Sequence, residues 1–116
     1  MSNEDKEQAV LAACLGQGRK LTGLIGYAGD SVVSKTILSK PVGNITLFAF
    51  DKGQGLSEHT SPYDAVVEII AGRAELTIGG RAMEISAGEL IVMPANIPHS
   101  VDAPERFKML LIMIRA

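Results

Sequence analysis

The sequence contains no tryptophan, only one cysteine and only two histidines among its 116 residues. The single cysteine, Cys14, cannot form an internal disulfide, so nothing points to an oxidising compartment. The apolar runs fall well short of the roughly 18 residues that identify a membrane-spanning helix. The acidic start, MSNEDKEQ, is unlike a signal peptide. We therefore expect a cytoplasmic protein that does not contact a membrane.

Positive charge is not concentrated anywhere along the chain. The net charge is −2 and the basic residues are scattered, whereas proteins that bind nucleic acid or an anionic membrane carry basic patches. The familiar short catalytic signatures are missing as well: there is no nucleophile elbow, no phosphate-binding GxxxxGK and no CxxC pair. We expect no nucleic-acid partner, and any chemistry must come from another arrangement.

A change of apolar period divides the chain. Residues 3–15 have the acidic first turn, the apolar spacing and the closing Gly16 of a short helix, and beyond them the apolar residues recur with a period of two. This length can bury only one core, so we predict one domain, with the helix in residues 1–16 and a β-barrel in residues 22–115. The expected strands cover residues 24–27, 32–38, 44–50, 64–71, 73–79, 82–86, 89–93, 98–103 and 106–114.

Short strands separated by glycine and proline turns, with no internal helix, favour an antiparallel sandwich or barrel. Gly79-Gly80 predicts a tight hairpin, because both central residues of the favoured turn need a positive φ. The last strand departs from alternation, since residues 109–114 are apolar on both faces. A second copy of the chain would cover the outer face, so we expect a homodimer; the alternative cover is the N-terminal helix of the same chain.

The two histidines lie forty residues apart, His59 after GQGLSE and His99 in the proline-bracketed turn MPANIPH. If the fold brings these two turns together, the imidazoles share one pocket. The turn around His99 resembles the second motif of the cupin family: glycine, five residues, Pro-x-Gly, two residues, His, three residues, Asn. Gly88, Pro94 and His99 match this motif, Asn96 stands in the glycine place, and the asparagine place falls on Ala103.

The stretch around His59 resembles the first cupin motif: glycine, five residues, His-x-His, three or four residues, Glu, six residues, Gly. Gly53, His59 and Gly72 match, whereas Ser61 replaces the second histidine and Ala65 replaces the glutamate. The two motifs and the hairpin between them cover nearly half of the chain. The resemblance implies an all-β fold, an antiparallel double-stranded β-helix or jelly-roll barrel with a short N-terminal helix.

In cupins the motif residues usually hold one divalent metal, so the resemblance implies His59 and His99 as ligands of Fe, Mn, Ni, Cu or Zn. Two imidazoles are fewer than the three or four protein ligands of a tight site. A bulge at Pro62 would turn Asp64 and Glu68 inward, where a carboxylate could join them. If the strand keeps its period, both carboxylates face outward.

The pocket is expected to have apolar walls and a few polar groups. Methionines adapt to irregular ligands but also fill gaps in cores, and both roles stay open for Met109 and Met113. The predicted lining consists of Phe48, His59, Ser61, Tyr63, Met93, His99, Met109 and Met113.

Such a pocket favours a cupin that binds a small molecule without redox chemistry, as a sensor or carrier. The alternative is a metal-dependent cupin enzyme of the dioxygenase, isomerase or decarboxylase type, with the metal held by His59 and His99. A metal-free enzyme that uses one histidine as acid or base and a dimeric scaffold without a ligand are the remaining hypotheses.

Overall fold

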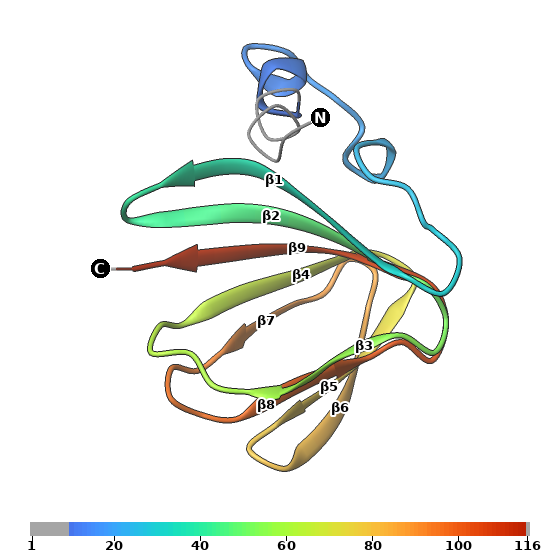
Figure 1. The fold of residues 1–116 in the computed structure, drawn as a ribbon, viewed down its shortest axis with the longest axis vertical. Helices are drawn as coiled ribbons and strands as arrows, with labels where there is room; N and C mark the ends of the chain where they lie inside the picture. Colours follow the sequence, from blue (N-terminus) through green and yellow to red (C-terminus); the bar gives the residue numbers. More distant parts are fainter. Residues whose placement is uncertain (1–9, 116) are drawn as a thin grey trace.

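A computed structural model describes residues 10–115 of the chain. Two antiparallel sheets face each other (Figure 1), one of five strands in the order β1-β2-β9-β4-β7 and one of four in the order β3-β8-β5-β6. The sheets lie close together at one end of the molecule and diverge toward the end that carries the β1–β2 turn. The strands are β1 (Val32–Lys40), β2 (Gly43–Phe50), β3 (Gly55–His59), β4 (Ala65–Ala71), β5 (Arg73–Ile78), β6 (Arg81–Ser86), β7 (Leu90–Met93), β8 (His99–Asp102) and β9 (Phe107–Ile114).

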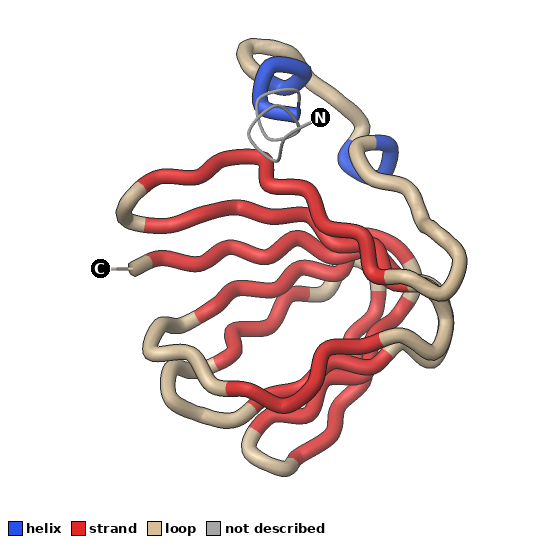
Figure 2. Tube along the Cα trace, in the orientation of Figure 1, coloured by secondary structure: helices blue, strands red, loops and turns tan. Residues whose placement is uncertain are grey.

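This architecture confirms the predicted all-β, antiparallel fold. Figure 2 shows helix only in the segment that precedes β1. Residues 10–14 are helical, and the rest of the helix predicted at residues 3–15 lies outside the described residues. The predicted Gly79-Gly80 hairpin joins β5 to β6, with φ values of 57° and 81° at its two glycines.

Two strand predictions were wrong. Residues 24–27 follow the short 3₁₀ turn η1 (Leu21–Gly23) and form no strand. The segment is apolar because Ile25, only 3% exposed, packs against a face of the sheet, and this gives it the sequence pattern of a buried strand. The strand β3 (Gly55–His59) was expected to be a turn. Leu56 is the only aliphatic residue of β3, and the other four residues of the strand are exposed. The alternation of apolar and polar residues that predicts a strand is therefore missing here.

The core fills the space between the sheets. Its largest fully buried side chains include Phe50 and Phe107, whose rings stack with centroids 4.4 Å apart. The buried core residues are Phe50, Ala65, Val67, Ile69, Ala74, Leu76, Met93, Val101, Ala103, Phe107 and Met109. Alternate residues of β4 and β9 supply much of this set, as expected for strands with one face on the core.

A second, smaller cluster lies on the outer face of the five-stranded sheet, where Ile25 packs over Leu47 and Ala49. The segment that carries Ile25 is held at Tyr27, whose ring lies 5.1 Å from the Arg106 guanidinium and 4.9 Å from the Lys108 ammonium. Part of the outer face of β9 is therefore covered by the segment that follows the helix, a cover that was not predicted.

Candidate functional site

The structure brings the two histidines together although forty residues separate them. Strands β3 and β8 pair antiparallel, and His59 lies directly opposite His99. Their Nε2 atoms are 3.1 Å apart, and the rings meet edge to face with centroids 4.4 Å apart. His99 is buried with 4% of its surface exposed, whereas His59 is exposed. One imidazole therefore lies inside the barrel and the other at its edge.

Two loops hold this pair in register. The backbone N–H of Asn96 donates to the carbonyl oxygen of Ser61 at 2.7 Å, and the N–H of Ala95 donates to a carboxylate oxygen of Asp64 at 2.8 Å. Asn96 has a φ of +63°, a conformation that asparagine tolerates better than most residues, which explains how it occupies a glycine place. Asp64 and Asn96 thus position the site, a role that the sequence analysis missed.

The hydrogen-bond partners of the Nδ1 atoms determine what the Nε2 atoms can do. Nδ1 of His59 lies 2.7 Å from the carbonyl oxygen of Ser57, and Nδ1 of His99 lies 3.2 Å from that of Ile97. A carbonyl oxygen only accepts, so these two contacts are hydrogen bonds in the tautomer that carries its hydrogen on the Nδ1 atom of each ring. In the neutral pair both Nε2 atoms then present lone pairs to each other. The site is therefore suited to a group that donates a hydrogen or carries positive charge.

A cavity of about 90 Å³ lies beside the pair. Its walls are mostly apolar and come from five strands and the residues that flank them, so that only His59, Ser61 and His99 bring side-chain polar atoms. The lining residues are Leu56, His59, Ser61, Ala65, Met93, His99, Val101, Met109, Leu111 and Met113. Leu111 was missed, although it follows Met109 and precedes Met113 at the spacing of one strand face.

Two residues predicted for this pocket lie elsewhere. Tyr63 lines a separate hollow together with Val66 and Ile112, because the chain leaves β3 at His59 and turns before β4 begins. Phe48 is paired with Met109 across β2 and β9 and packs against the core, but it does not line the cavity. A strand that continued without a break would place Tyr63 on the same face as His59. The break between β3 and β4 explains why Tyr63 does not line the cavity.

The residues present do not make the usual metal site of three or four protein ligands. Ala65 has no donor atom, and the Ser61 hydroxyl already accepts the N–H of Tyr63 at 3.2 Å. Ala65, Val67 and Ile69 face the core, so the inward turn of Glu68 that a bulge would cause does not occur. Within residues 10–115, no group of three or more His, Cys, Asp or Glu side chains is placed to hold a metal.

The His99 imidazole makes stability depend on pH. Burial lowers its pKa, and the charge of nearby His59 lowers it further. The hydrogen bond to the Ile97 carbonyl raises the pKa, but by less than either of these effects lowers it. Between this lowered pKa and the ordinary value of 6.5, the unfolded chain binds a proton that the folded chain does not. We expect the free energy of unfolding to fall as the pH drops through this window, by less in His99→Gln. Urea unfolding of both proteins across the window measures the difference, and equal pH slopes would contradict the expectation.

Two antiparallel sheets folded over a small cavity, with histidines from two distant segments at its edge, define a double-stranded β-helix protein. The chain belongs to the cupin family, since the family model described as "Cupin domain" matches residues 46–115. This confirms the resemblance seen in the two motifs. Among the described residues, no helix is long and apolar enough to cross a membrane.

Solved structures of bacterial proteins are similar to this chain. A Streptococcus pyogenes protein of unknown function has 39% identity and a TM-score of 0.82, over 86% of this chain and 88% of that one. A cupin 2 conserved barrel domain protein from Leptotrichia buccalis has 38% identity and a TM-score of 0.78, over 81% of this chain and 46% of that one.

An uncharacterised Streptomyces coelicolor protein is 29% identical over 56 residues, 48% of this chain and 53% of that protein. The chain thus spans about half the length of the curated relative that it matches. These comparisons support the fold and the family and leave the specific activity open.

Proposed function

We propose that this cupin binds a compact, largely apolar molecule with one hydrogen-bond-donating group, which contacts the Nε2 atoms of His59 and His99. The proposal rests on one observation: two Nε2 atoms whose Nδ1 partners are carbonyl oxygens converge at the edge of an otherwise apolar cavity. A hydroxyl or N–H group can satisfy lone pairs that would otherwise face each other.

The size of the cavity limits the ligand. Pockets for drug-sized molecules hold roughly 300–1,000 Å³, whereas this cavity holds about 90 Å³. Since liquid water occupies about 30 Å³ per molecule, the space suits a ligand of only a few heavy atoms. Met93, Met109 and Met113 line it with flexible thioethers, which adapt to irregular apolar shapes.

The methionine methyl groups provide a direct test. Isobutanol is the donor-bearing probe, and isopropyl methyl ether has the same size but no donor. We expect isobutanol to shift the NMR signals of the Met93, Met109 and Met113 methyl groups and leave that of Met83, which does not line the cavity. The ether should bind more weakly by about fivefold or more, because it leaves the imidazoles unsatisfied.

His59 is an exposed residue at the end of β3, so its replacement should leave the fold intact. We expect His59→Ala to remove the preference for isobutanol over the ether, whereas Glu58→Ala, the adjacent exposed residue outside the cavity lining, should keep it. Equal affinity of the two probes for the wild-type protein would overturn the proposal. Mass spectrometry of protein purified without an affinity tag would then identify any molecule that occupies the cavity.

A metal-dependent cupin enzyme is the second candidate function. The convergence of the two Nε2 lone pairs favours it, since each Nδ1–H is fixed by a carbonyl oxygen in the way that ligating histidines usually are. Two nitrogens are too few for a tightly held ion, so substrate and water would have to complete the coordination. Stoichiometric metal in the untagged protein, lost in His59→Ala and kept in Glu58→Ala, would support this enzyme over the metal-free binder.

A further inference from the structure

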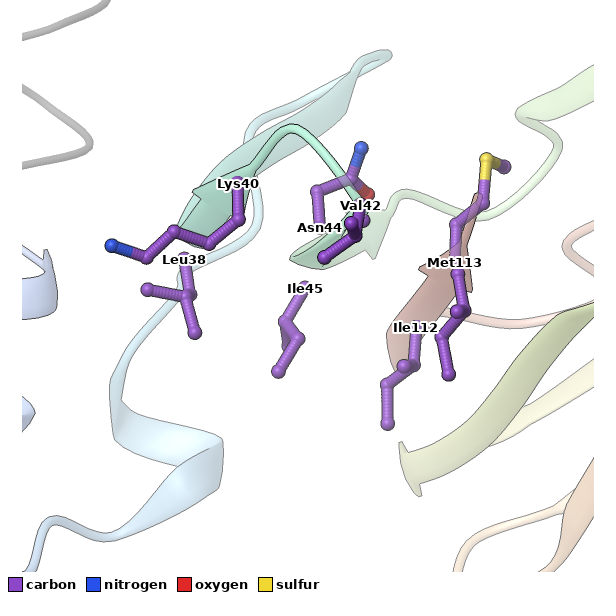
Figure 3. Close-up of a pocket in the computed structure, with 9 residues that line it drawn as sticks. Leu38, Lys40, Val42, Asn44, Ile45, Ile112 and Met113 are labelled. Carbon is purple, nitrogen blue, oxygen red and sulfur yellow. The ribbon is translucent and has the colours of Figure 1, made fainter. Parts of the chain in front are cut away.

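Two methionines flank the position where the usual carboxylate of the family is missing. Ala65 stands in the glutamate place, and in the five-stranded sheet it pairs with Met93 of β7 on one side and with Met113 of β9 on the other. Neighbouring strands lie about 4.8 Å apart, so two long side chains can approach each other above the small alanine. Both methionines line the cavity beside the histidine pair. Figure 3 shows the Met113 side chain projecting away from the side of β9 that carries Ile112.

The connections of the chain bring this row close to the imidazoles. Strand β3 ends at His59, and after a short loop β4 begins at Ala65. Strand β7 ends at Met93, and after a second short loop β8 begins at His99. Two hydrogen bonds join these loops to each other. The two imidazoles and the two thioethers therefore gather at the same end of the barrel.

The chemistry of these donors indicates which ion they suit. Imidazole nitrogen and thioether sulfur both suit copper, and thioethers select its monovalent form, whereas zinc sites use thiolate, imidazole and carboxylate ligands. None of the described residues that line the cavity is an Asp or a Glu. An ion with one positive charge is therefore favoured over a divalent ion, because the cost of taking an ion out of water rises steeply with its charge.

The spacing of the imidazoles is compatible with one bound ion. The Nε2 atoms are 3.1 Å apart, and each has its lone pair free in the tautomer whose Nδ1–H donates to a backbone carbonyl oxygen. For metal–nitrogen distances of about 2.0–2.1 Å, this separation corresponds to an angle of about 100° at the metal. An angle of this size leaves room for two further ligands in a distorted tetrahedron.

We propose that the cavity binds one Cu⁺ ion through the Nε2 atoms of His59 and His99 and the thioether sulfurs of Met93 and Met113. The two methionines supply donors in place of the second histidine and the glutamate, which this chain lacks. The inference goes beyond the proposed function, because a copper ion needs the sulfur atoms, whereas an organic ligand with a donor group needs only the imidazoles and apolar walls.

Anaerobic titration of the untagged protein with Cu⁺, in competition with the coloured chelator bicinchoninate, measures the affinity. We expect one Cu⁺ ion per chain. Replacement of methionine by leucine removes the sulfur and keeps the volume, so the fold should persist. Residues that only orient metal ligands usually contribute about 10- to 100-fold to affinity, so Met93→Leu and Met113→Leu should each weaken binding by about tenfold or more.

Two other methionines provide matched controls. Met109 lines the same cavity but lies four residues before Met113 in β9, roughly 13 Å along the strand. Met83 does not line the cavity. Met109→Leu and Met83→Leu should therefore both keep the wild-type affinity for Cu⁺.

X-ray absorption at the copper edge tests the ligands in the wild-type protein, where nitrogen and sulfur neighbours are both expected. Failure to take Cu⁺ from the chelator, nitrogen neighbours alone, or displacement of Cu⁺ by excess Zn²⁺ would overturn the proposal. So would wild-type affinity in both Met93→Leu and Met113→Leu. The preference for isobutanol over the ether is measured without copper, so the failure of either proposal is recognised separately from that of the other.

Discussion

Replacing Phe107 by alanine is expected to lower the free energy of unfolding by about 3–5 kcal/mol. Phe107 is fully buried between the sheets and its ring stacks on that of Phe50, with an angle of 10° between the ring planes. The variant loses the transfer energy of the ring and leaves a cavity that two opposing sheets cannot fully close. A loss of this size is a large part of the stability of a domain this small.

Thermal and urea unfolding followed by circular dichroism would measure this effect. The melting temperature should fall by about 10 °C or more. Leu15→Ala is the control, since Leu15 is 69% exposed and its truncation should change the stability by no more than about 0.5 kcal/mol. A similar loss in both variants would mean that the Phe50–Phe107 stack does not dominate the core.

Gly72→Ala should also be strongly destabilising, by about 3 kcal/mol or more. Gly72 joins β4 to β5 with a φ of +73°, and a Cβ atom there would overlap the carbonyl oxygen of Arg106. The penalty thus has two parts, the left-handed backbone conformation and a collision with the backbone that leads into β9.

Gly80→Ala separates these two parts. Gly80 has a φ of +81°, yet a Cβ atom there would meet no atom within 4 Å, so only the conformational cost of about 1–2 kcal/mol remains. Denaturant unfolding of both variants gives the comparison. If Gly72→Ala were no worse than Gly80→Ala, the close approach of the chain beside Gly72 would have no energetic consequence.

The parts of the fold that were predictable are those with strong local signals. Short apolar runs bounded by turn residues identified β4 and β9, and the paired glycines identified the β5–β6 hairpin, since each signal lies within a few neighbouring residues. The exposed strand β3 has no such signal, because its pairing with β8 depends on a partner forty residues away. Residues 24–27 have the apolar pattern of a strand but lie in a loop, because their apolar side chains are buried against the outer face of the five-stranded sheet.

The site was predictable in its histidines and not in its shape. The spacing of the two motifs indicated His59 and His99, and Met109 and Met113 were expected in the lining as adaptable apolar side chains. The location of Tyr63 depended on where β3 ended. The sequence does not determine this end, because Pro62 lies in a stretch rich in turn-forming residues. The cavity volume depends on how side chains from several strands interdigitate, and the direction of each Nε2 depends on backbone carbonyls, so neither could be read from composition or period.

The final strand has a double role that restricts how the chain can change. Met109, Leu111 and Met113 line the cavity, while the intervening Leu110 and Ile112 lie on the opposite face. An insertion or deletion of one residue within β9, between Phe107 and Met109, would exchange these two sets, because successive side chains of a strand alternate. The branched side chains would then fill the barrel and the thioethers would leave it. Length variation among relatives should therefore be tolerated in the loops around β9 and not within it.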